Sequence, residues 1–459
     1  MKKTVFLFII LACAATAKAQ DTTQNVIDKT KIQLKITDAR SKLYAGNVRG
    51  ALNLFREVLV VDKDHAGGNY GIAECYYGLK DYDNAKSHIE KAYDRNPEVD
   101  RDVELIYGMI LHQHGDIDDA MTHYKKYYEQ YKKKKRILED TGIETLIAQC
   151  QYAIDNKTNL MDVKIANLGG RINTAYPEFA PCISPDGKSL ILTSRRGDTK
   201  GGGLDLNSDH QYFSDIYVSQ WNEEEQTWDE AERLPGKVNT EYHDGALGFT
   251  NKGELLIYRN IMNVTRSGDI YYSKQSSSSG KWGSPKEMLE KAEMNKVLNS
   301  SYFESSASMT GDGKELYFVS DRPKKALGMA DIYVMRKKGR TWSEPENLGK
   351  NINTSGDEKM VYIHPSGKFL FFATNGREDG YGSYDLYYCV REESGKWSEP
   401  KNMGAPINTV MEEKTISISS DGKTAYVSAY YAKNNRGDAD IYKIDVSHLE
   451  IPAYVPESE

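Results

Sequence analysis

Residues 406–422 read PINTVMEEKTISISSDG, and this stretch decides the fold because its frame recurs in four other places. In every copy an Asn lies five residues before an acid, and the acid lies nine residues before a Gly. An internal repeat of roughly 55 residues built from strands and tight turns predicts a radial or stacked β architecture. The copies begin at Asn173, Asn239, Asn299, Asn353 and Asn408.

Each copy continues in the same order after its turn Gly. A short apolar strand such as residues 369–372 comes first, and an Asp-Ile-Tyr or Asp-Leu-Tyr triplet such as residues 385–387 follows. Four copies then carry a Trp before a last strand, which gives four strands per copy and predicts a propeller blade. This count favours five blades; six is the alternative and would require a degenerate blade. The tryptophans are Trp228, Trp282, Trp342 and Trp397.

The fifth copy lacks both the Trp and a final strand after Tyr442. The missing strand has a counterpart at the other end of the repeat region, because residues 163–169 match the last strand of the other copies, for example residues 346–349. We therefore expect residues 163–169 to complete the last blade and close the ring.

Residues 26 to 155 instead show helical patterns with short polar breaks. Ala51, Ala85 and Ala120 recur at spacings of 34 and 35 residues, and small residues at such points let paired helices approach closely. This segment resembles the tetratricopeptide repeats, whose period is 34 residues. The resemblance implies a helical array whose groove receives a peptide or a partner domain.

The N-terminus has the pattern of a processing signal: Lys2 and Lys3, a short apolar run, and the small-residue site Ala17-Lys18-Ala19. We expect export, with cleavage near Gln20. The alternative is lipidation at Cys13, because Ile10-Leu11-Ala12-Cys13 resembles a lipobox. The sequence thus predicts an α+β multidomain protein. Its parts are a signal peptide (1–19), a helical repeat domain (21–157), a propeller (160–450) and a C-terminal tail (451–459).

Charge and cysteine content exclude some functions. The net charge is −7, and removal of Lys2, Lys3 and Lys18 with the signal changes it to −10. Such an acidic chain is unsuited to nucleic acid, whose phosphates need basic partners. The later cysteines show no C-x-x-C spacing, so the sequence indicates no metal or redox motif, and a Cys75–Cys150 disulfide stays open.

The propeller pattern resembles the TolB-type, WD40-like repeats of outer-membrane and periplasmic proteins, most closely in residues 178–188, 320–323 and 397–409. The order of a tetratricopeptide array and then a propeller is similar to envelope proteins that continue into an OmpA-like domain, some of them in type IX secretion. This sequence ends at Glu459 without such a domain. Peptidoglycan binding is therefore not expected from the resemblance.

The repeated acids precede the first strand of each blade, so they would form a ring of carboxylates near one mouth of the channel. This ring could bind a cation or another ligand, or each acid could serve its own blade by pairing with a basic residue or capping backbone N–H groups. The sequence alone favours the local role. The acids are Glu178, Asp244, Glu304, Glu358 and Glu413.

Two segments that depart from the repeat are further candidate binding sites. Asp205, Asn207 and Asp209 have the spacing of a calcium loop, but His210 stands where its Gly is expected and Ile216 where its Glu is expected. A solvated turn is the simpler interpretation of this loop. An inserted helical stretch at residues 285–297 could contact a partner, because symmetry-breaking insertions often do.

The near-equivalent acids do not fit a glycosidase, which needs two carboxyl groups in different environments, and no other catalytic motif is present. We expect no enzyme and no cofactor. The first hypothesis is an envelope scaffold, periplasmic or associated with the outer membrane, that binds proteins through the helical groove and a propeller face and belongs to a secretion complex. A glycan-binding propeller is the alternative, and a glycoside hydrolase is third.

Overall fold

The computed structural model describes residues 29–206, 208–260, 268–431 and 435–454. The chain forms two compact units. One runs to His114 and includes Leu206–His210, and the other comprises Gly115–Asp205 and Gln211–Glu459. The boundary at His114 falls inside the range 21–157 that the sequence predicts to be helical.

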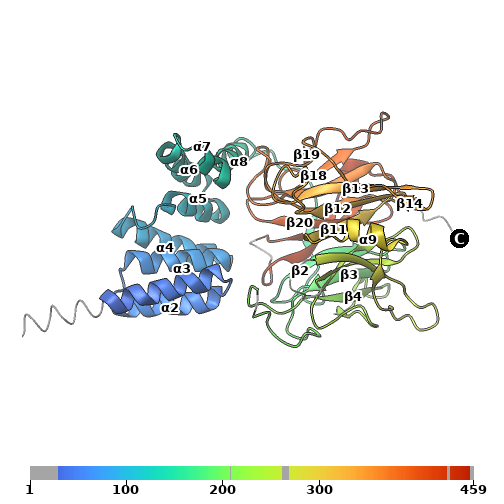
Figure 1. Ribbon diagram of the computed structural model, residues 1–459, viewed down its shortest axis with the longest axis horizontal. Coiled ribbons are helices and arrows are strands. Elements are labelled where there is room, and N and C mark those ends of the chain that lie inside the picture. The colour runs from blue at the N-terminus through green and yellow to red at the C-terminus, as the bar shows by residue number, and fades with distance from the viewer. Residues whose placement is uncertain (1–28, 207, 261–267, 432–434, 455–459) are drawn as a thin grey trace, which may run out of the picture. The chain divides into compact units, whose positions relative to one another are not determined.

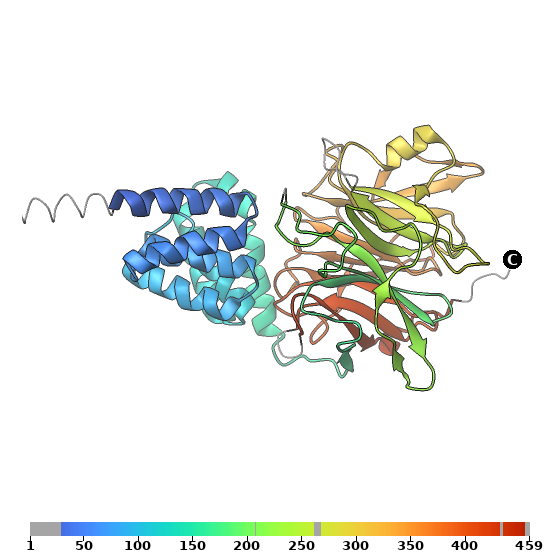
Figure 2. The same cartoon turned by 90° about the horizontal axis from the view of Figure 1, so that it is seen from below.

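The first unit is a series of antiparallel helices, blue to cyan in Figures 1 and 2. The alanines of the repeat pack where the helices meet: Ala51 and Ala85 have no exposed surface. Asn47 and Asp81 cap helices through hydrogen bonds to backbone N–H groups of the first turn. The helices are residues 29–44, α2 (Val48–Val61), α3 (Ala66–Gly78), α4 (Tyr82–Arg95) and α5 (Val103–His114).

The second unit begins with three more helices, and α6 and α8 contribute side chains that pack against the propeller. These are α6 (Ile117–Tyr131), α7 (Lys135–Thr141) and α8 (Ile143–Asp155). The buried side-chain amide of Gln149 on α8 donates to the carbonyl oxygens of Asn375 and Arg377, at 3.1 and 3.0 Å. Tyr152 packs edge-to-face on Tyr381, with ring centroids 5.1 Å apart. These contacts fix α8 to the fourth blade.

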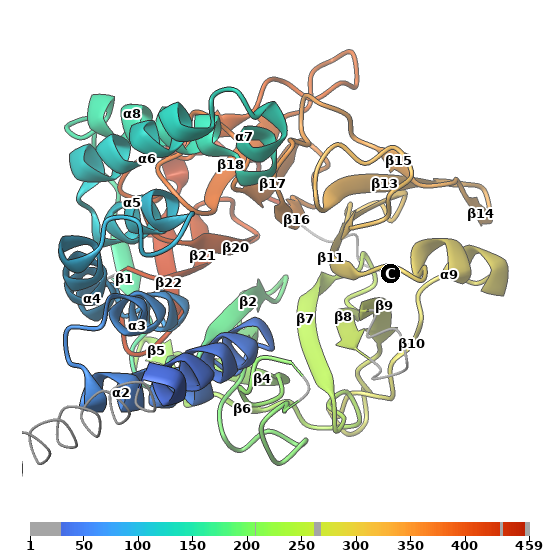
Figure 3. The ribbon, with the colours of Figure 1, turned by 60° about the vertical axis from the view of Figure 1, so that its left-hand side comes forward.

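Five antiparallel sheets follow, one for each copy of the repeat. Figure 3 shows the innermost strands β2, β7, β11, β16 and β20 around the centre of the propeller. The five-bladed prediction is confirmed. The strands are β2 (Glu178–Ile183), β3 (Ser189–Ser194), β4 (Asp215–Asn222), β5 (Thr227–Trp228) and β6 (Glu232–Arg233) in blade 1; β7 (His243–Phe249), β8 (Leu255–Asn260), β9 (Gly268–Ser273) and β10 (Lys286–Glu287) in blade 2; β11 (Glu304–Met309), β12 (Glu315–Ser320), β13 (Asp331–Lys338), β14 (Thr341–Trp342) and β15 (Glu346–Asn347) in blade 3; β16 (Glu358–Ile363), β17 (Phe369–Thr374), β18 (Asp385–Val390) and β19 (Lys401–Asn402) in blade 4; and β20 (Glu413–Ile418), β21 (Thr424–Ala429) and β22 (Asp440–Asp445) in blade 5.

Blade 5 is completed by β1 (Ile165–Asn167), which pairs antiparallel with β22 through the register Ile165–Ile444 and Asn167–Tyr442. The prediction that residues 163–169 close the ring is therefore confirmed. Closure by an N-terminal strand gives β22 a pairing partner and ties the two ends of the propeller sequence together.

The Asn of each repeat joins its blade to the preceding one. The Asn239 side chain, for example, accepts from the N–H of Ile216 at 2.8 Å and donates to the carbonyl of the same residue at 2.9 Å. An amide that meets a backbone donor and acceptor in this way mimics one rung of a β ladder and satisfies two buried groups. The equivalent pairs are Asn173–Ile441, Asn299–Ile270, Asn353–Ile332 and Asn408–Leu386.

The insertion after blade 2 differs in part from the prediction. Lys286 and Glu287 form the outer strand β10, and the helix α9 (Ala292–Leu298) starts only after it. Cys75 and Cys150 are buried thiols and do not form a disulfide. None of the helices in the described ranges combines the length and apolarity needed to cross a bilayer.

Candidate binding surfaces of the propeller

The five repeated acids have no exposed surface. Each accepts two hydrogen bonds, from the backbone N–H and from the side-chain hydroxyl of the Thr or Ser four residues earlier. In blade 1 the Thr174 N–H and hydroxyl lie 2.8 and 2.7 Å from the Glu178 carboxylate. The other pairs are Thr240–Asp244, Ser300–Glu304, Thr354–Glu358 and Thr409–Glu413.

The acids differ in their basic partners. Arg196 and Arg322 bind Glu178 and Glu304 at 3.2 and 2.9 Å, and Arg259 lies 3.4 Å from Asp244. In the described part of the chain, no basic side chain forms an ion pair with the acids of blades 4 and 5. Burial raises the pKa of all five acids, to about 6 for Asp244, to about 7 for Glu358 and well above its ordinary value for Glu413.

The hydroxyl that binds each acid also fixes the backbone of the residue two positions later. Thr240 Oγ1 accepts the N–H of Tyr242 at 3.2 Å, and the same bond recurs in every blade. The buried acid thus orients the hydroxyl, and the hydroxyl orients a surface position of the rim. These hydrogen bonds fit a local role of each acid within its own blade. That the ring of acids binds a ligand stays a prediction. The rim positions are Tyr176, Tyr242, Tyr302, Gly356 and Met411.

The calcium-loop candidate is only partly described, because Asn207 lies outside the described residues. Asp205 is buried, and its carboxylate lies 3.3 Å from Nε2 of His243. Within the described ranges, no group of three or more His, Cys, Asp or Glu side chains is arranged to hold a metal ion. Cys13 also lies outside the described residues, so lipidation stays a prediction.

The same contact belongs to a Ser-His-Asp arrangement that the sequence analysis missed. The Ser214 hydroxyl lies 3.2 Å from Nδ1 of His243, whose Nε2 faces Asp205. A nucleophile needs a base that is ready to take its proton, but the backbone N–H of Ser214 also donates to Nδ1, at 3.1 Å. Ser214 is itself buried. The three side chains therefore serve to hold the long loop of blade 1 in place. Asp205 and His243 are 38 residues apart, so their contact leaves no motif in the sequence.

One end of the propeller carries exposed apolar side chains. The rim tyrosines Tyr176, Tyr242 and Tyr302 are 38–42% exposed, and Met329 is 74% exposed. Leu204, Phe303 and Leu327 are exposed in adjacent rim and strand-connecting loops. The antiparallel register places all seven side chains at the end where the innermost strands begin, in blades 1 to 3. We call them the apolar face; the described residues of the blades show no exposed large apolar side chain at the opposite end.

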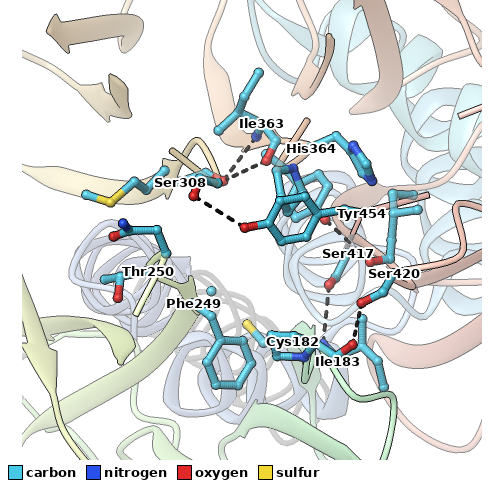
Figure 4. Close-up of a pocket in the computed structure, with 18 of the residues that line it drawn as sticks. Cys182, Ile183, Phe249, Thr250, Ser308, Ile363, His364, Ser417, Ser420 and Tyr454 are labelled. Carbon is cyan, nitrogen blue, oxygen red and sulfur yellow. Dashed lines mark hydrogen bonds between the residues drawn. The ribbon is translucent and has the colours of Figure 1, made fainter. Parts of the chain in front are cut away.

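The opposite end of the channel contains a cavity of about 340 Å³ (Figure 4). All five innermost strands or their turns contribute to it, and its apolar lining includes Phe249, Met309 and Tyr362. Cys182 lines the same cavity, and burial raises the pKa of its thiol to about 12. Tyr454 from the C-terminal segment also borders the cavity.

Comparison with known protein families finds a match for the helical part. The family model described as Tetratricopeptide repeat matches residues 37–100 and 80–134. The helical array is a set of tetratricopeptide repeats. No curated protein matches the chain.

Solved structures resemble each part separately. The type III secretion translocator chaperone SycD of Yersinia enterocolitica is 16% identical, with 28% of this protein and 96% of the chaperone covered and a TM-score of 0.25. A putative TolB from Agrobacterium tumefaciens is 17% identical over 61% of this protein and 87% of its own length, with a TM-score of 0.34. The periplasmic gluconolactonase PpgL of Pseudomonas aeruginosa is 11% identical over 58% of this protein and 87% of its own length, with a TM-score of 0.33.

Proposed function

We propose that the protein is a non-catalytic scaffold of the cell envelope that binds protein partners through the tetratricopeptide groove and the apolar face of the propeller. The apolar face is the observation that carries the proposal. Monomeric proteins rarely leave large apolar side chains clustered on one surface unless that surface binds something. Aromatic residues and Met are also enriched where proteins contact one another.

The rim supplies the rigidity that such a surface needs. Tyr242 and its equivalents are held by a backbone hydrogen bond to a hydroxyl that a buried acid fixes. A side chain presented on a fixed backbone loses less conformational entropy on binding than one on a mobile loop. Tyr loses little rotamer freedom and combines an apolar ring with a polar hydroxyl. The arrangement therefore suits anchor residues of a protein interface.

The test is affinity capture from detergent-solubilised envelope, followed by binding of the purified partner. We expect a specific envelope protein to bind the mature chain with micromolar or better affinity. The variant Tyr242→Ser/Met329→Ser should weaken that binding at least ten-fold. Leu160→Ser is the matched control, because Leu160 is 63% exposed and lies outside the apolar face. Equal binding by all three proteins would refute the role of the apolar face.

A glycan-binding propeller remains the second candidate, because aromatic residues occupy the same rim position in three consecutive blades. Saccharides that raise the melting temperature of the wild type but not of the Tyr242→Ser variant would favour it. Loss of partner binding without any saccharide effect would favour the scaffold.

Export and membrane attachment belong to the same proposal. The mass of the mature protein separates the alternatives: cleavage near Gln20 leaves an unmodified chain, whereas lipidation leaves Cys13 at the N-terminus with added acyl mass. Either mature form fits an envelope scaffold, and recovery of the uncleaved chain would contradict export.

A further inference from the structure

The C-terminal segment crosses the end of the channel that lies opposite the apolar face. After the last strand of blade 5, Ile451 is buried in the core of that blade. Three residues later, the Tyr454 N–H donates to the carbonyl of Ser420 at 2.7 Å, and its phenol donates to the carbonyl of Gly311 at 3.3 Å. The segment therefore joins the turn of blade 5 to the turn of blade 3 (Figure 4).

Two glycines lie against this segment, and one of them, Gly422, is the turn glycine that every copy of the repeat carries. A Cβ atom at Gly422 would lie 2.2 Å from the carbonyl oxygen of Ile451. A Cβ atom at Gly311 would lie 2.5 Å from the Tyr454 ring, and 2.7 Å from the Pro365 carbonyl. Both distances are too short for any other residue type without rearrangement.

The Gly311 position is informative because the repeat gives four comparisons. The other blades carry a side chain at this place in the turn, and blade 3, over which the Tyr454 ring lies, carries none. The equivalent residues are Pro185, Asn251, Pro365 and Ser420. The sequence of one blade thus provides the space that the Tyr454 ring occupies, which we call the seat of the ring.

A cavity lies behind this seat. Its volume of about 340 Å³ is at the lower end of the range typical of ligand pockets, about 300–1,000 Å³. Tyr454 forms part of its wall, so displacement of the segment would enlarge the space and widen its opening to solvent. The resident segment also shows what the seat accepts: a main-chain N–H, a buried aliphatic side chain, and an aromatic ring three positions later.

We propose that this end of the channel is a binding site for an extended peptide with an aliphatic residue followed three positions later by an aromatic one, and that Ile451–Tyr454 occupies the site in the free protein. The segment acts as an intramolecular competitor, and an incoming peptide must displace it. The site is separate from the apolar face and does not depend on the partner that the face binds.

Cys182 provides a built-in reporter of the competitor's displacement. Burial suppresses its thiolate, and admission of water would both expose the sulfur and lower the pKa of the thiol toward its ordinary value. The experiment treats the native mature protein with iodoacetamide and measures alkylation of each cysteine by peptide mass spectrometry. Cys75 and Cys389 are matched internal controls, because both are buried and neither lines the cavity.

We expect Tyr454→Ala to raise the alkylation rate of Cys182 by about ten-fold or more, with the two control cysteines unchanged. Tyr454→Phe keeps the ring and should stay close to the wild type. A synthetic peptide with the sequence of residues 447–457 should restore protection in the Tyr454→Ala protein. The same peptide with Ala in place of its Tyr should not.

Unchanged Cys182 reactivity in Tyr454→Ala, and in a chain that ends at Ala453, would refute the closing role of Tyr454. Increased reactivity that the peptide does not reverse would refute the peptide site. If Tyr454→Ala accelerates all cysteines together, the variant has lost its fold. The peptide's direct binding to the chain that ends at Ala453, measured by fluorescence anisotropy, then decides the proposal.

Discussion

Glu304 and Glu413 occupy the same position of the repeat in opposite electrostatic surroundings, so replacing each with Gln tests what the buried ring does. The Glu304 carboxylate accepts from Ser320 and from Arg322, whose side chain is only 11% exposed. In Glu304→Gln the guanidinium keeps its bonds to the Val297 and Leu298 carbonyls and to the Ser320 hydroxyl but loses its counter-charge. Removal of one partner of a buried pair costs about 3–5 kcal/mol. Because these three hydrogen bonds remain, we expect a loss near the lower limit.

Glu413 lacks those partners. Ala429 and Tyr431 stand where blade 3 has Ser320 and Arg322, and Thr409 supplies both hydrogen bonds to the carboxyl group. Burial raises the pKa of Glu413 well above its ordinary value, so the fold favours the protonated form of this group. Gln has the shape of that protonated form. We expect Glu413→Gln to change the free energy of unfolding by less than about 1 kcal/mol at pH 5.

The two variants should also differ in pH dependence. The pKa of Glu413 is higher in the folded than in the unfolded state, so its contribution to stability is present below the unfolded-state value and is lost as pH rises toward the folded-state value. The loss is about 1.4 kcal/mol per pH unit within that window. Glu413→Gln removes this loss, and the variant should therefore gain stability relative to the wild type as pH rises above the unfolded-state value.

Urea unfolding followed by Trp fluorescence is the appropriate assay, because all five tryptophans lie in the propeller sequence. Glu344→Gln is the control for the chemical change at an exposed site. Equal losses in Glu304→Gln and Glu413→Gln would show that the basic partner does not set the effect of the substitution. A Glu413→Gln variant that weakens with rising pH would refute the assignment of a protonated carboxyl.

Three further predictions concern other contacts. Asn239→Ala should destabilise the propeller by about 2–4 kcal/mol in the same urea assay, because the N–H and carbonyl of Ile216 lose their partner; an effect below about 0.5 kcal/mol would contradict the joining role. Burial lowers the pKa of His364 to about 4, so the free energy of unfolding should fall as pH decreases from 6.5 to 4. His364→Gln should make that fall smaller and leave the free energy of unfolding above pH 7 unchanged. Gln149→Leu should speed amide hydrogen exchange in α8 while the innermost strands keep their protection, and unchanged exchange in α8 would contradict its attachment to blade 4.

The blades could be predicted because each is a local unit of four strands with its own turn. The Asn-acid-Gly frame, the triplet and the Trp mark the strands in order, and the missing last strand of blade 5 indicated how β1 closes the ring. The local role of the acids was also the favoured interpretation. Its details needed structure, because the basic partner of Glu178 or Glu304 comes 18 residues later and is absent in other copies.

Contacts between distant parts of the chain gave no comparable signal. Ser214, His243 and Asp205 meet only when blade 1 packs beside blade 2, and the Tyr454 phenol reaches a carbonyl 143 residues away. One sign of the Tyr454 contact is visible in the sequence: Gly311 stands where the other copies carry a side chain in this turn. A glycine that breaks a repeat has meaning only once the neighbour that fills its space is known.

The repeat frame explains how a symmetric scaffold can carry an asymmetric function. Its Asn joins neighbouring blades, its acid fixes a hydroxyl, and the hydroxyl fixes the next rim position, so all three stabilising contacts are made by residues other than the rim side chain. The rim side chain can therefore vary without loss of those contacts. Blades 1 to 3 use this freedom for Tyr, whereas blades 4 and 5 carry Gly356 and Met411. Stability thus resides in what the blades share, and the recognition that we propose would reside in the positions where they differ.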